Sequence, residues 1–203
     1  MSKVVAINAA VQRALIAAQA APDEMLLESI AAGDRSAMHT LYSRHHVRVY
    51  RFILRMVRDP ATTEDLTSQV FLDVWRTANR FQGRSQVSTW LLSIARFKAL
   101  TALRQRKHEG IDQEEILEMA DEAETPETCL HRTSTNAILR ACVAKLSPAH
   151  REIIDLVYYH EKSVEEVGQI IGIPQSTVKT RMFYARKQLA DLLKVAGVES
   201  LAA

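Results

Sequence analysis

The segment from Ser163 to Leu189 constrains the fold more than any other part of the sequence. Ser163 suits the N-cap of a short apolar helix over 164–171, and Gly172 is suited to end that helix. Gly172-Ile-Pro174 then supplies a tight turn before a longer helix over about 175–194. Two helices joined by such a turn form a helix-turn-helix, whose second helix enters the major groove of duplex DNA.

The second helix of this motif carries the side chains expected to touch DNA. At helical spacing Val178, Met182, Ala185 and Leu189 share one face, which should pack on the core. The other side mixes cations, hydroxyls and aromatic rings, which suits phosphates, base edges and thymine methyl groups. The alternatives are an ordinary solvated helix and, for Phe183 alone, packing against a neighbouring helix. The residues expected to contact the duplex are Ser176, Thr177, Lys179, Thr180, Arg181, Phe183 and Tyr184.

Charge is segregated along the chain, although the net charge is only +2. Every Asp, Glu, Lys or Arg between residues 74 and 107 is basic, and every one between 109 and 127 is acidic. Residues 175–189 contain four cations and again no acid: Lys179, Arg181, Arg186 and Lys187. Two basic blocks joined by an acidic one indicate two nucleic-acid contacts and an anionic tether.

The chain is predicted to be all-α, because it has only 6 glycines and 5 prolines and no strong hairpin signal. Its 203 residues suit two small helical domains joined by an acidic linker, the C-terminal one being the helix-turn-helix. The alternative for the linker is an acidic amphipathic helix docked on the first domain. The expected division is a flexible N-terminal extension over 1–22, a helical domain over 23–107, the linker over 108–134 and the helix-turn-helix domain over 135–203.

Caps and apolar periodicity predict the helices of both domains. Asp59-Pro60 is expected to end the helix over 36–57, and Thr62 or Thr63 is expected to cap the helix that follows. Thr89 is expected to cap the last helix of the first domain, and Ser147 the second helix of the other domain. The expected helices cover about 25–32, 36–57, 63–79, 90–106, 136–146, 148–160, 164–171 and 175–194.

A second candidate for nucleic-acid binding lies in the first domain. A short polar loop over 84–88 precedes an apolar helix that begins at Trp90, and basic side chains follow along that helix. Cations beside such a loop can hold an unpaired strand while the loop pockets a base drawn from the stack. The alternative for Trp90 is core packing. The residues expected at this site are Arg84, Ser85, Gln86, Val87, Ser88, Trp90, Arg96 and Lys98.

The helix over 63–79 has large apolar side chains on a polar face. Its core face is accounted for by other residues, so Leu72 and Trp75 fall beside Asp65 and Arg76. Large apolar groups among charged ones on a surface indicate a protein interface. The alternative is that Trp75 covers a neighbouring helix.

No enzyme, metal, cofactor or membrane pattern competes with this interpretation. The chain lacks HExxH, GxxxxGK[ST], GxGxxG and GxSxG motifs, and no apolar run is long enough to cross a bilayer, so no direct membrane insertion is expected. Cys129 and Cys142 show no metal spacing and are expected to be reduced thiols. We therefore expect no catalytic activity, no metal and no cofactor.

At these residues the chain resembles the extracytoplasmic-function (ECF) sigma factors of bacterial RNA polymerase. Residues 64–75 (EDLTSQVFLDVW), 81–83 (FQG) and 89–95 (TWLLSIA) resemble the second region of these proteins. Residues 146–148 (LSP) and 177–186 (TVKTRMFYAR) resemble the fourth region. The resemblance covers about 25–194 with the motifs in matching order and spacing, and joint occurrence makes it specific.

The resemblance implies a cytoplasmic factor that binds core RNA polymerase and directs transcription from particular promoters. Asp65, Gln69, Leu72 and Trp75 would grip the clamp helices of the largest subunit, and the polymerase flap would be a further contact. The loop over 84–88 and the helix from Trp90 would capture the melted −10 strand, and the helix from Gln175 would read the −35 duplex. The acidic linker would occupy polymerase channels. An anti-sigma partner and a stress signal are also implied.

Some positions depart from the pattern of the family. Ser68-Gln69 stands where Gln-Glu or Gln-Asp is frequent, Phe97 where asparagine is common, and Tyr184 where arginine is frequent. The departures leave the class intact but bear on the promoter sequence and on contact details, and Ser68-Gln69 lacks one carboxylate expected in the polymerase interface. One alternative function is a free-standing helix-turn-helix regulator, which leaves the first domain unexplained. Another is a sigma mimic that only sequesters a regulatory protein, and the basic recognition helix counts against it.

Overall fold

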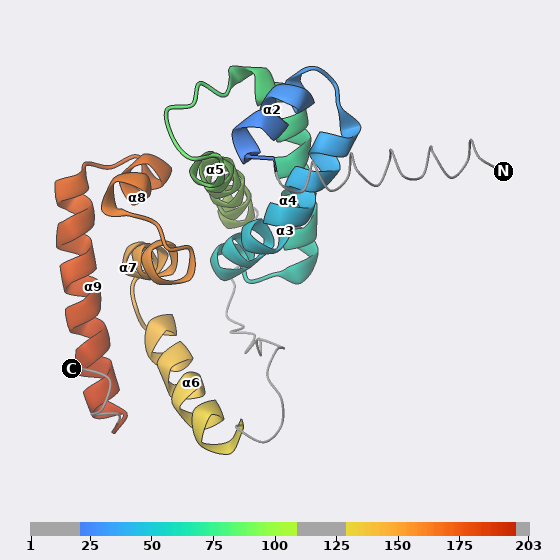
Figure 1. Ribbon diagram of the computed structural model, residues 1–203. Coiled ribbons are helices and arrows are strands. Elements are labelled where there is room, and N and C mark those ends of the chain that lie inside the picture. Colours follow the sequence, from blue (N-terminus) through green and yellow to red (C-terminus); the bar gives the residue numbers. More distant parts are fainter. Residues whose placement is uncertain (1–20, 109–128, 198–203) are drawn as a thin grey trace. The chain divides into compact units, whose positions relative to one another are not determined.

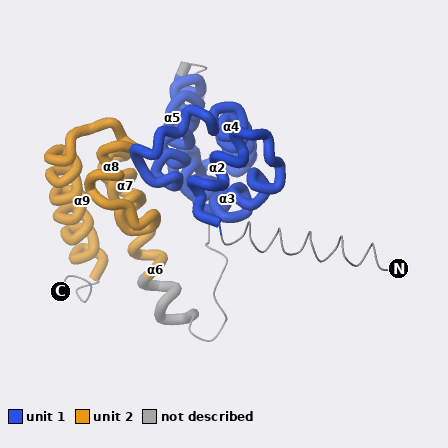
Figure 2. Tube along the Cα trace, turned by 45° about the horizontal axis from the view of Figure 1, so that its top comes forward, with its two compact units in different colours: residues 1–113 blue, residues 114–203 orange. Residues whose placement is uncertain are grey.

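The computed structural model describes residues 21–108 and 129–197, which belong to two compact helical units (Figure 1, Figure 2). Every regular element in the described ranges is helical, as the sequence predicts. Most of the expected extension over 1–22 and of the expected acidic linker over 108–134, namely residues 1–20 and 109–128, lies outside these ranges. Among the described helices, none combines the length and apolar character that a membrane crossing requires.

Unit 1 is built around α3, which contacts α2, α4 and α5, while α4 also packs on α5. The apolar stripes of these helices meet in one core that includes Leu27, Leu41, Phe52, Ile53 and Leu91. This packing leaves the opposite faces of α4 and α5 open to partners. The elements are α2 (Asp23–Ala31), α3 (Arg35–Val57), α4 (Pro60–Thr77), the short 3₁₀ helix η1 (Ala78–Arg80) and α5 (Val87–His108).

The start of α4 corrects the prediction that Thr62 or Thr63 caps this helix. The helix begins at Pro60, and the Asp59 carboxylate accepts a hydrogen bond from the Thr62 amide at 3.1 Å. Proline is favourable in the first turn because its missing N–H has no partner there in any helix. Asp59-Pro60 is therefore a helix start as well as a break.

The start of α5 corrects the prediction that Thr89 caps a helix from Trp90. The helix begins at Val87, and the amides of Thr89 and Trp90 both donate to the carbonyl of Gln86, at 3.0 and 3.1 Å. Thr89 is buried, at 2% exposure. Val87 and Ser88, the last two residues of the predicted loop over 84–88, therefore belong to the first turn of α5, and Gln86 directly precedes it.

Asp59 also ties the start of α4 to the end of α5, because Arg106 Nη2 lies 2.6 Å from its carboxylate. Hydrogen bonds from the Thr62 side chain, and then from Arg106, hold the pKa of Asp59 below its ordinary value. A lowered folded-state pKa stabilises the fold at pH above the unfolded value of about 4, and this contribution disappears as pH falls through the folded value.

We predict that Asp59→Ala lowers the free energy of unfolding of unit 1 by about 1 kcal/mol at pH 7, the usual effect of losing a cap. In Asp59→Asn the cap acceptor remains, so the difference from the parent should be smaller and should shrink on acidification. Both tryptophans, Trp75 and Trp90, lie in unit 1, so urea unfolding followed by tryptophan fluorescence measures this unit. A difference between parent and Asp59→Asn that does not change with pH would contradict the linkage.

Unit 2 is built around α9, on which three other helices pack. Its core includes Leu146, Ile154 and Ala185, and Leu189 and Leu192 pack against these residues. The helices α6, α7 and α8 all contact α9. The elements are α6 (Cys129–Ala144), α7 (Pro148–Ile154), a π turn (Asp155–Tyr159), α8 (Val164–Ile171) and α9 (Gln175–Val195).

The local chemistry of the helix-turn-helix follows the prediction closely. Ser163 caps α8 in a capping box, in which its hydroxyl accepts the Glu166 amide while the Glu166 carboxylate accepts the Ser163 amide. Gly172 ends α8 at φ 76°, a left-handed conformation that favours glycine. A Cβ on Gly168 would lie 3.0 Å from the Ile173 carbonyl oxygen, so glycine lets the turn fold back on α8.

Two features of unit 2 differ from the sequence-based expectation. The helix expected from Asn136 begins at Cys129, so residues 129–134 are helical rather than part of a linker. The helix expected to run to about His160 ends at Ile154 and passes into the π turn, where the His160 amide donates to the Asp155 carbonyl at 3.1 Å. Apolar periodicity does not distinguish an α turn from a π turn.

Candidate nucleic-acid interface

The helix α9 turns an amphipathic face to the core, as its periodicity predicts. Val178 and Ala185 are fully buried, and Met182 and Leu189 are partly buried. Of the residues expected to contact duplex DNA, two are half-buried, Thr177 and Arg181. The others are exposed: Ser176, Lys179, Thr180, Phe183 and Tyr184.

The exposed side of α9 is rich in cations and contains no acid over most of its length. Lys179, Arg186 and Lys187 are exposed, and the first acid of the helix is Asp191. Among the described residues, no ion pair involves a side chain of α9. Such a face attracts a polyanion such as the phosphate backbone of DNA.

Two aromatic rings lie within this cationic face. Phe183 is 62% exposed and Tyr184 54% exposed, and their ring centroids are 5.5 Å apart in an edge-to-face arrangement. Phe183 therefore does not pack into a neighbouring helix of unit 2, which was the alternative. The Thr180 hydroxyl donates to the Ser176 carbonyl at 3.0 Å and is already engaged.

In unit 1 the loop before α5 presents only part of the residues expected to hold a single strand. Arg84 and Gln86 are exposed, and Ser85 and Ser88 are half-buried. Val87 is 2% exposed and belongs to the core, because it is the first residue of α5 and points toward the other helices. We therefore leave Val87 out of the residues proposed to contact DNA.

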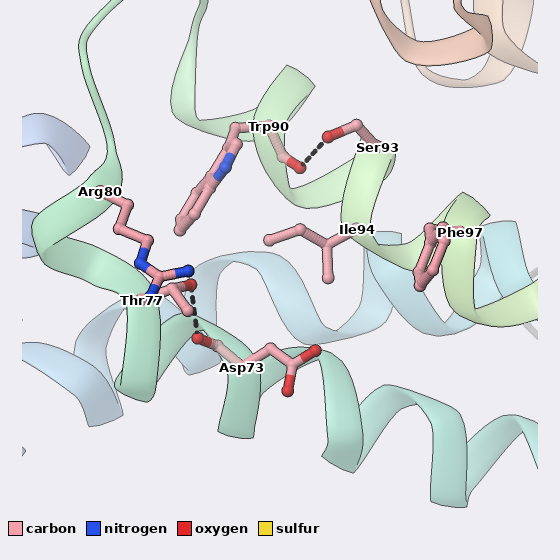
Figure 3. Close-up of a pocket in the computed structure, with 7 residues that line it drawn as sticks. All are labelled: Asp73, Thr77, Arg80, Trp90, Ser93, Ile94 and Phe97. Carbon is pink, nitrogen blue, oxygen red and sulfur yellow. Dashed lines mark hydrogen bonds between the residues drawn. The ribbon is translucent and has the colours of Figure 1, made fainter.

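Trp90 borders an open hollow of about 370 Å³ between the end of α4, η1 and the start of α5. Its ring is half-buried and packs at 5.4 Å from that of Phe81, so part of its surface serves the fold. Figure 3 shows Trp90, Ile94 and Phe97 along α5, facing Arg80, Thr77 and Asp73. Of the residues that line the hollow, only Trp90 was predicted from the sequence to bind nucleic acid.

Phe97 and Asp73 line this hollow, and neither was predicted from the sequence to belong to a binding site. Phe97 is 69% exposed, which is unusual for a phenylalanine in the middle of a helix. Asp73 Oδ2 lies 2.6 Å from Lys98 Nζ, so Lys98 is held by a carboxylate and is less available for phosphate than the sequence suggests. Arg96, the other cation expected here, is half-buried.

The exposed face of α4 carries the residues expected to bind a protein. Asp65 and Gln69 are exposed, Leu72 is 45% exposed, and Trp75 is half-buried. The opposite face is buried through Leu66, Val70, Phe71 and Val74, as the periodicity predicts. An exposed leucine between polar side chains on a regular helix suits a docking surface.

Comparison with known families matches both units. Residues 41–109 match sigma-70 region 2, and residues 142–191 match sigma-70, region 4. The chain belongs to the sigma-70 family. Sigma factors are transcription initiation factors rather than enzymes. As a member of the family, the chain binds core RNA polymerase and promoter DNA and directs transcription initiation.

Relatives of this sigma factor belong to the ECF group, which confirms the resemblance noted in the sequence. It is 32% identical over 171 residues to ECF RNA polymerase sigma factor BldN of Streptomyces coelicolor, covering 83% of this chain and 64% of BldN. It is 30% identical over 167 residues to ECF RNA polymerase sigma factor SigK of Mycobacterium sp. (strain KMS), covering 78% and 84%. It is 31% identical over 170 residues to RNA polymerase sigma factor CarQ of Myxococcus xanthus, covering 82% and 95%.

Solved structures share the fold of this sigma factor. CnrH, solved with the cytosolic domain of CnrY, superposes with a TM-score of 0.64 at 20% identity, covering 85% of this chain and 97% of that chain. RpoE of Bartonella quintana, solved with the anti-sigma factor NepR, gives 0.63 at 23% identity, covering 76% and 94%.

Proposed function

We propose that this sigma factor divides its work among three surfaces. The exposed face of α4 binds core RNA polymerase, the start of α5 with the loop before it captures the unwound −10 strand, and α9 reads the −35 duplex. The single observation that carries the proposal is the acid-free, cationic and aromatic face of α9 at the end of a helix-turn-helix. Residues 23–107 and 129–203 would be the two working domains, the second one starting with α6.

The proposal for the −10 strand is supported by the hollow beside Trp90. Base stacking on an aromatic ring contributes about 1–3 kcal/mol and tolerates any base, and a hollow of about 370 Å³ has room for a base. Arg84 and Gln86 lie exposed in the preceding loop, where they can contact phosphates or base edges. The remaining residues proposed to contact the −10 strand, beside Arg84, Gln86 and Trp90, are Ser85, Ser88, Arg96 and Lys98.

The proposal for polymerase binding is supported by the mixture of side chains on α4. Interfaces often centre on an exposed apolar group surrounded by polar groups that remain hydrated until docking. Leu72 is such a group, and Asp65 and Gln69 lie exposed on the same helix. The clamp helices of the largest subunit are the proposed partner there, and the flap is a further proposed contact of the C-terminal unit.

We propose control by an anti-sigma factor, a role in a stress response and a cytoplasmic location. RpoE, a structural relative, was solved with an anti-sigma factor, and CnrH with a cytosolic domain of another protein. The acidic segment between 109 and 127 is proposed to lie in polymerase channels that otherwise accept RNA, because the segment and RNA are both polyanions.

The function is tested by adding the purified chain to core polymerase and transcribing a library of candidate promoters. Transcripts that depend on the chain are expected, and the promoters that give rise to them should share sequence elements near −10 and −35. An absence of chain-dependent transcripts, together with tight duplex binding by the chain alone, would favour a free-standing regulator. A pull-down from native cells should recover polymerase and any inhibitor together.

The polymerase surface is tested by Asp65→Lys combined with Leu72→Glu. The pair removes an apolar anchor and reverses a charge, so affinity for core polymerase should fall about 30-fold, the equivalent of about 2 kcal/mol at an interface centre. Binding of an isolated −35 duplex should change little. The measurement is competition for core polymerase against the unlabelled parent chain.

Val47→Glu is the matched control for the Leu72→Glu part of this variant, because Val47 is 46% exposed on α3 and Leu72 is 45% exposed on α4. The control should bind polymerase like the parent. Equal losses in the control and the α4 variant, or a loss of duplex binding in the α4 variant, would place the polymerase contact elsewhere. Trp75→Ala is less informative, because Trp75 is half-buried and its removal also affects packing.

A further inference from the structure

Two exposed aromatic rings in the middle of α9 are not explained by phosphate binding. Phe183 and Tyr184 are 62% and 54% exposed, whereas phosphates are bound by cations, hydroxyls and amides. Exposed aromatic side chains at a binding surface usually contribute directly to recognition. Their partner must therefore offer apolar groups as well as charge.

The surroundings of the rings favour DNA over a protein partner. Lys179 precedes Phe183 by one turn of α9 and Lys187 follows it by one turn, and both lysines are exposed. With no acid before Asp191, this face is attracted to phosphates on both sides of the rings. Lysines that held the backbone on either side would place Phe183 toward the base edges between them, with Tyr184 next to it on the same helix.

The chemistry of the major groove limits which base these rings can select. Thymine presents a C5 methyl group, whereas guanine presents two acceptors that require donors. Phe183 has no donor, Tyr184 has one hydroxyl, and the Thr180 hydroxyl one turn before Tyr184 already donates to the Ser176 carbonyl. The rings are therefore matched to a methyl group and poorly matched to guanine.

We propose that Phe183 and Tyr184 are specificity-determining residues that select thymine, through its methyl group, at the base pairs they face. The proposal rests on the proposed function, in which α9 reads the −35 duplex. It predicts that promoters bound by this sigma factor contain thymine, on either strand, at the positions opposite these side chains.

The test uses holoenzyme reconstituted from core polymerase and the full chain. Duplexes are recovered from a library randomised at the −35 element, and each thymine in the consensus is replaced singly by deoxyuridine, which removes only the methyl group. At one or two positions the replacement should weaken binding about fourfold, the effect of withdrawing one buried methyl group. Elsewhere it should have no effect.

Variants assign this methyl sensitivity to its residues. In Phe183→Ala and Tyr184→Ala, thymine and deoxyuridine should bind equally at the affected position, while Tyr184→Phe should keep the difference because the ring remains. Tyr184→Arg should shift selection toward guanine, because two N–H groups of the arginine can donate to the two acceptors of guanine. Tyr158→Ala is the matched control, since Tyr158 is 56% exposed in the same unit but lies outside α9.

The inference and the function it rests on fail in different ways. If the sigma factor supports transcription and α9 variants weaken −35 binding, but deoxyuridine has no effect or its effect persists in both alanine variants, the inference is overturned and the function stands. A consensus without thymine has the same meaning. Alanine variants that reduce polymerase affinity without changing base selection would assign the rings to a protein contact and also overturn it.

Discussion

Lys179→Glu combined with Arg181→Glu is expected to weaken binding of the −35 duplex about 30-fold or more while leaving affinity for core polymerase unchanged. Each cation lost from a DNA contact costs about 1 kcal/mol or more, and two such losses multiply to this factor. Lys179 is exposed, and Arg181 is half-buried at the edge of the same face. Reversal adds repulsion from the phosphates to the lost attraction.

Salt dependence distinguishes lost phosphate contacts from misfolding. Each phosphate contact contributes about 0.9 to the slope of log affinity against log salt, so the double variant should lower that slope by about 2. The measurement is anisotropy of a labelled −35 duplex with holoenzyme at several salt concentrations. An unchanged slope with reduced affinity would indicate a damaged fold rather than missing contacts.

Lys145→Glu combined with Lys194→Glu is the charge-matched control. Both lysines are exposed, one just after α6 and the other in the last turn of α9. The control changes net charge equally, so general electrostatic attraction falls equally, but the proposed reading face is intact. Equal losses in the two double variants would contradict the assignment of duplex reading to the first half of α9.

The parts of the fold that were predicted correctly depend on interactions between near neighbours in sequence. The cap at Ser163, the left-handed Gly172 and the Ser147-Pro148 start each involve residues within one turn of a helix. Caps, turns and apolar periodicity are local, so a single sequence displays them. The separation of α9 into a buried and an exposed face follows from the same periodicity.

The parts that were missed depend on contacts between distant residues. Asp59 binds Arg106, and Asp73 binds Lys98, and neither partner is visible from local spacing. Val87 was predicted to contact DNA but is buried in the core, and its burial depends on how α5 packs on the other helices. The hollow beside Trp90 is assembled from three elements and exists only once they are folded together. Sequence patterns therefore predicted most of the exposed faces, but not the ion pairs or the hollow that depend on the folded core.

Lys162 is another residue whose surroundings could not be predicted from local sequence, because a lysine is ordinarily expected to be exposed to solvent. Its side chain is only 3% exposed, and its Nζ lies 2.8 Å from Glu166 Oε1. The other oxygen of that carboxylate accepts the Ser163 amide at 2.9 Å. A buried Asp155–His160 pair, at 3.3 Å, lies in the adjoining π turn and the residue after it. One carboxylate thus joins a buried ammonium to the cap of α8, the first helix of the helix-turn-helix.

Glu166→Ala is therefore expected to destabilise unit 2 by about 3 kcal/mol, the lower end of the range for removing one partner of a buried ion pair. The buried ammonium loses this carboxylate, and α8 loses half of its capping box. A loss of that size is a large share of the stability of a small domain. Hydrogen exchange of the full chain should become faster across α7, α8 and α9, while tryptophan fluorescence, which reports unit 1, stays unchanged.

Two further variants separate the buried charge from the cap. Glu165→Ala removes an exposed acid from the same first turn and should cost well under about 1 kcal/mol, because exposed charges at a helix N-terminus contribute little. Lys162→Met combined with Glu166→Ala removes the charge together with its partner, so most of the lost protection should return, since an apolar side chain of similar length tolerates burial. If this double variant exchanges as fast as Glu166→Ala alone, the stabilisation comes from the cap and not from neutralising Lys162.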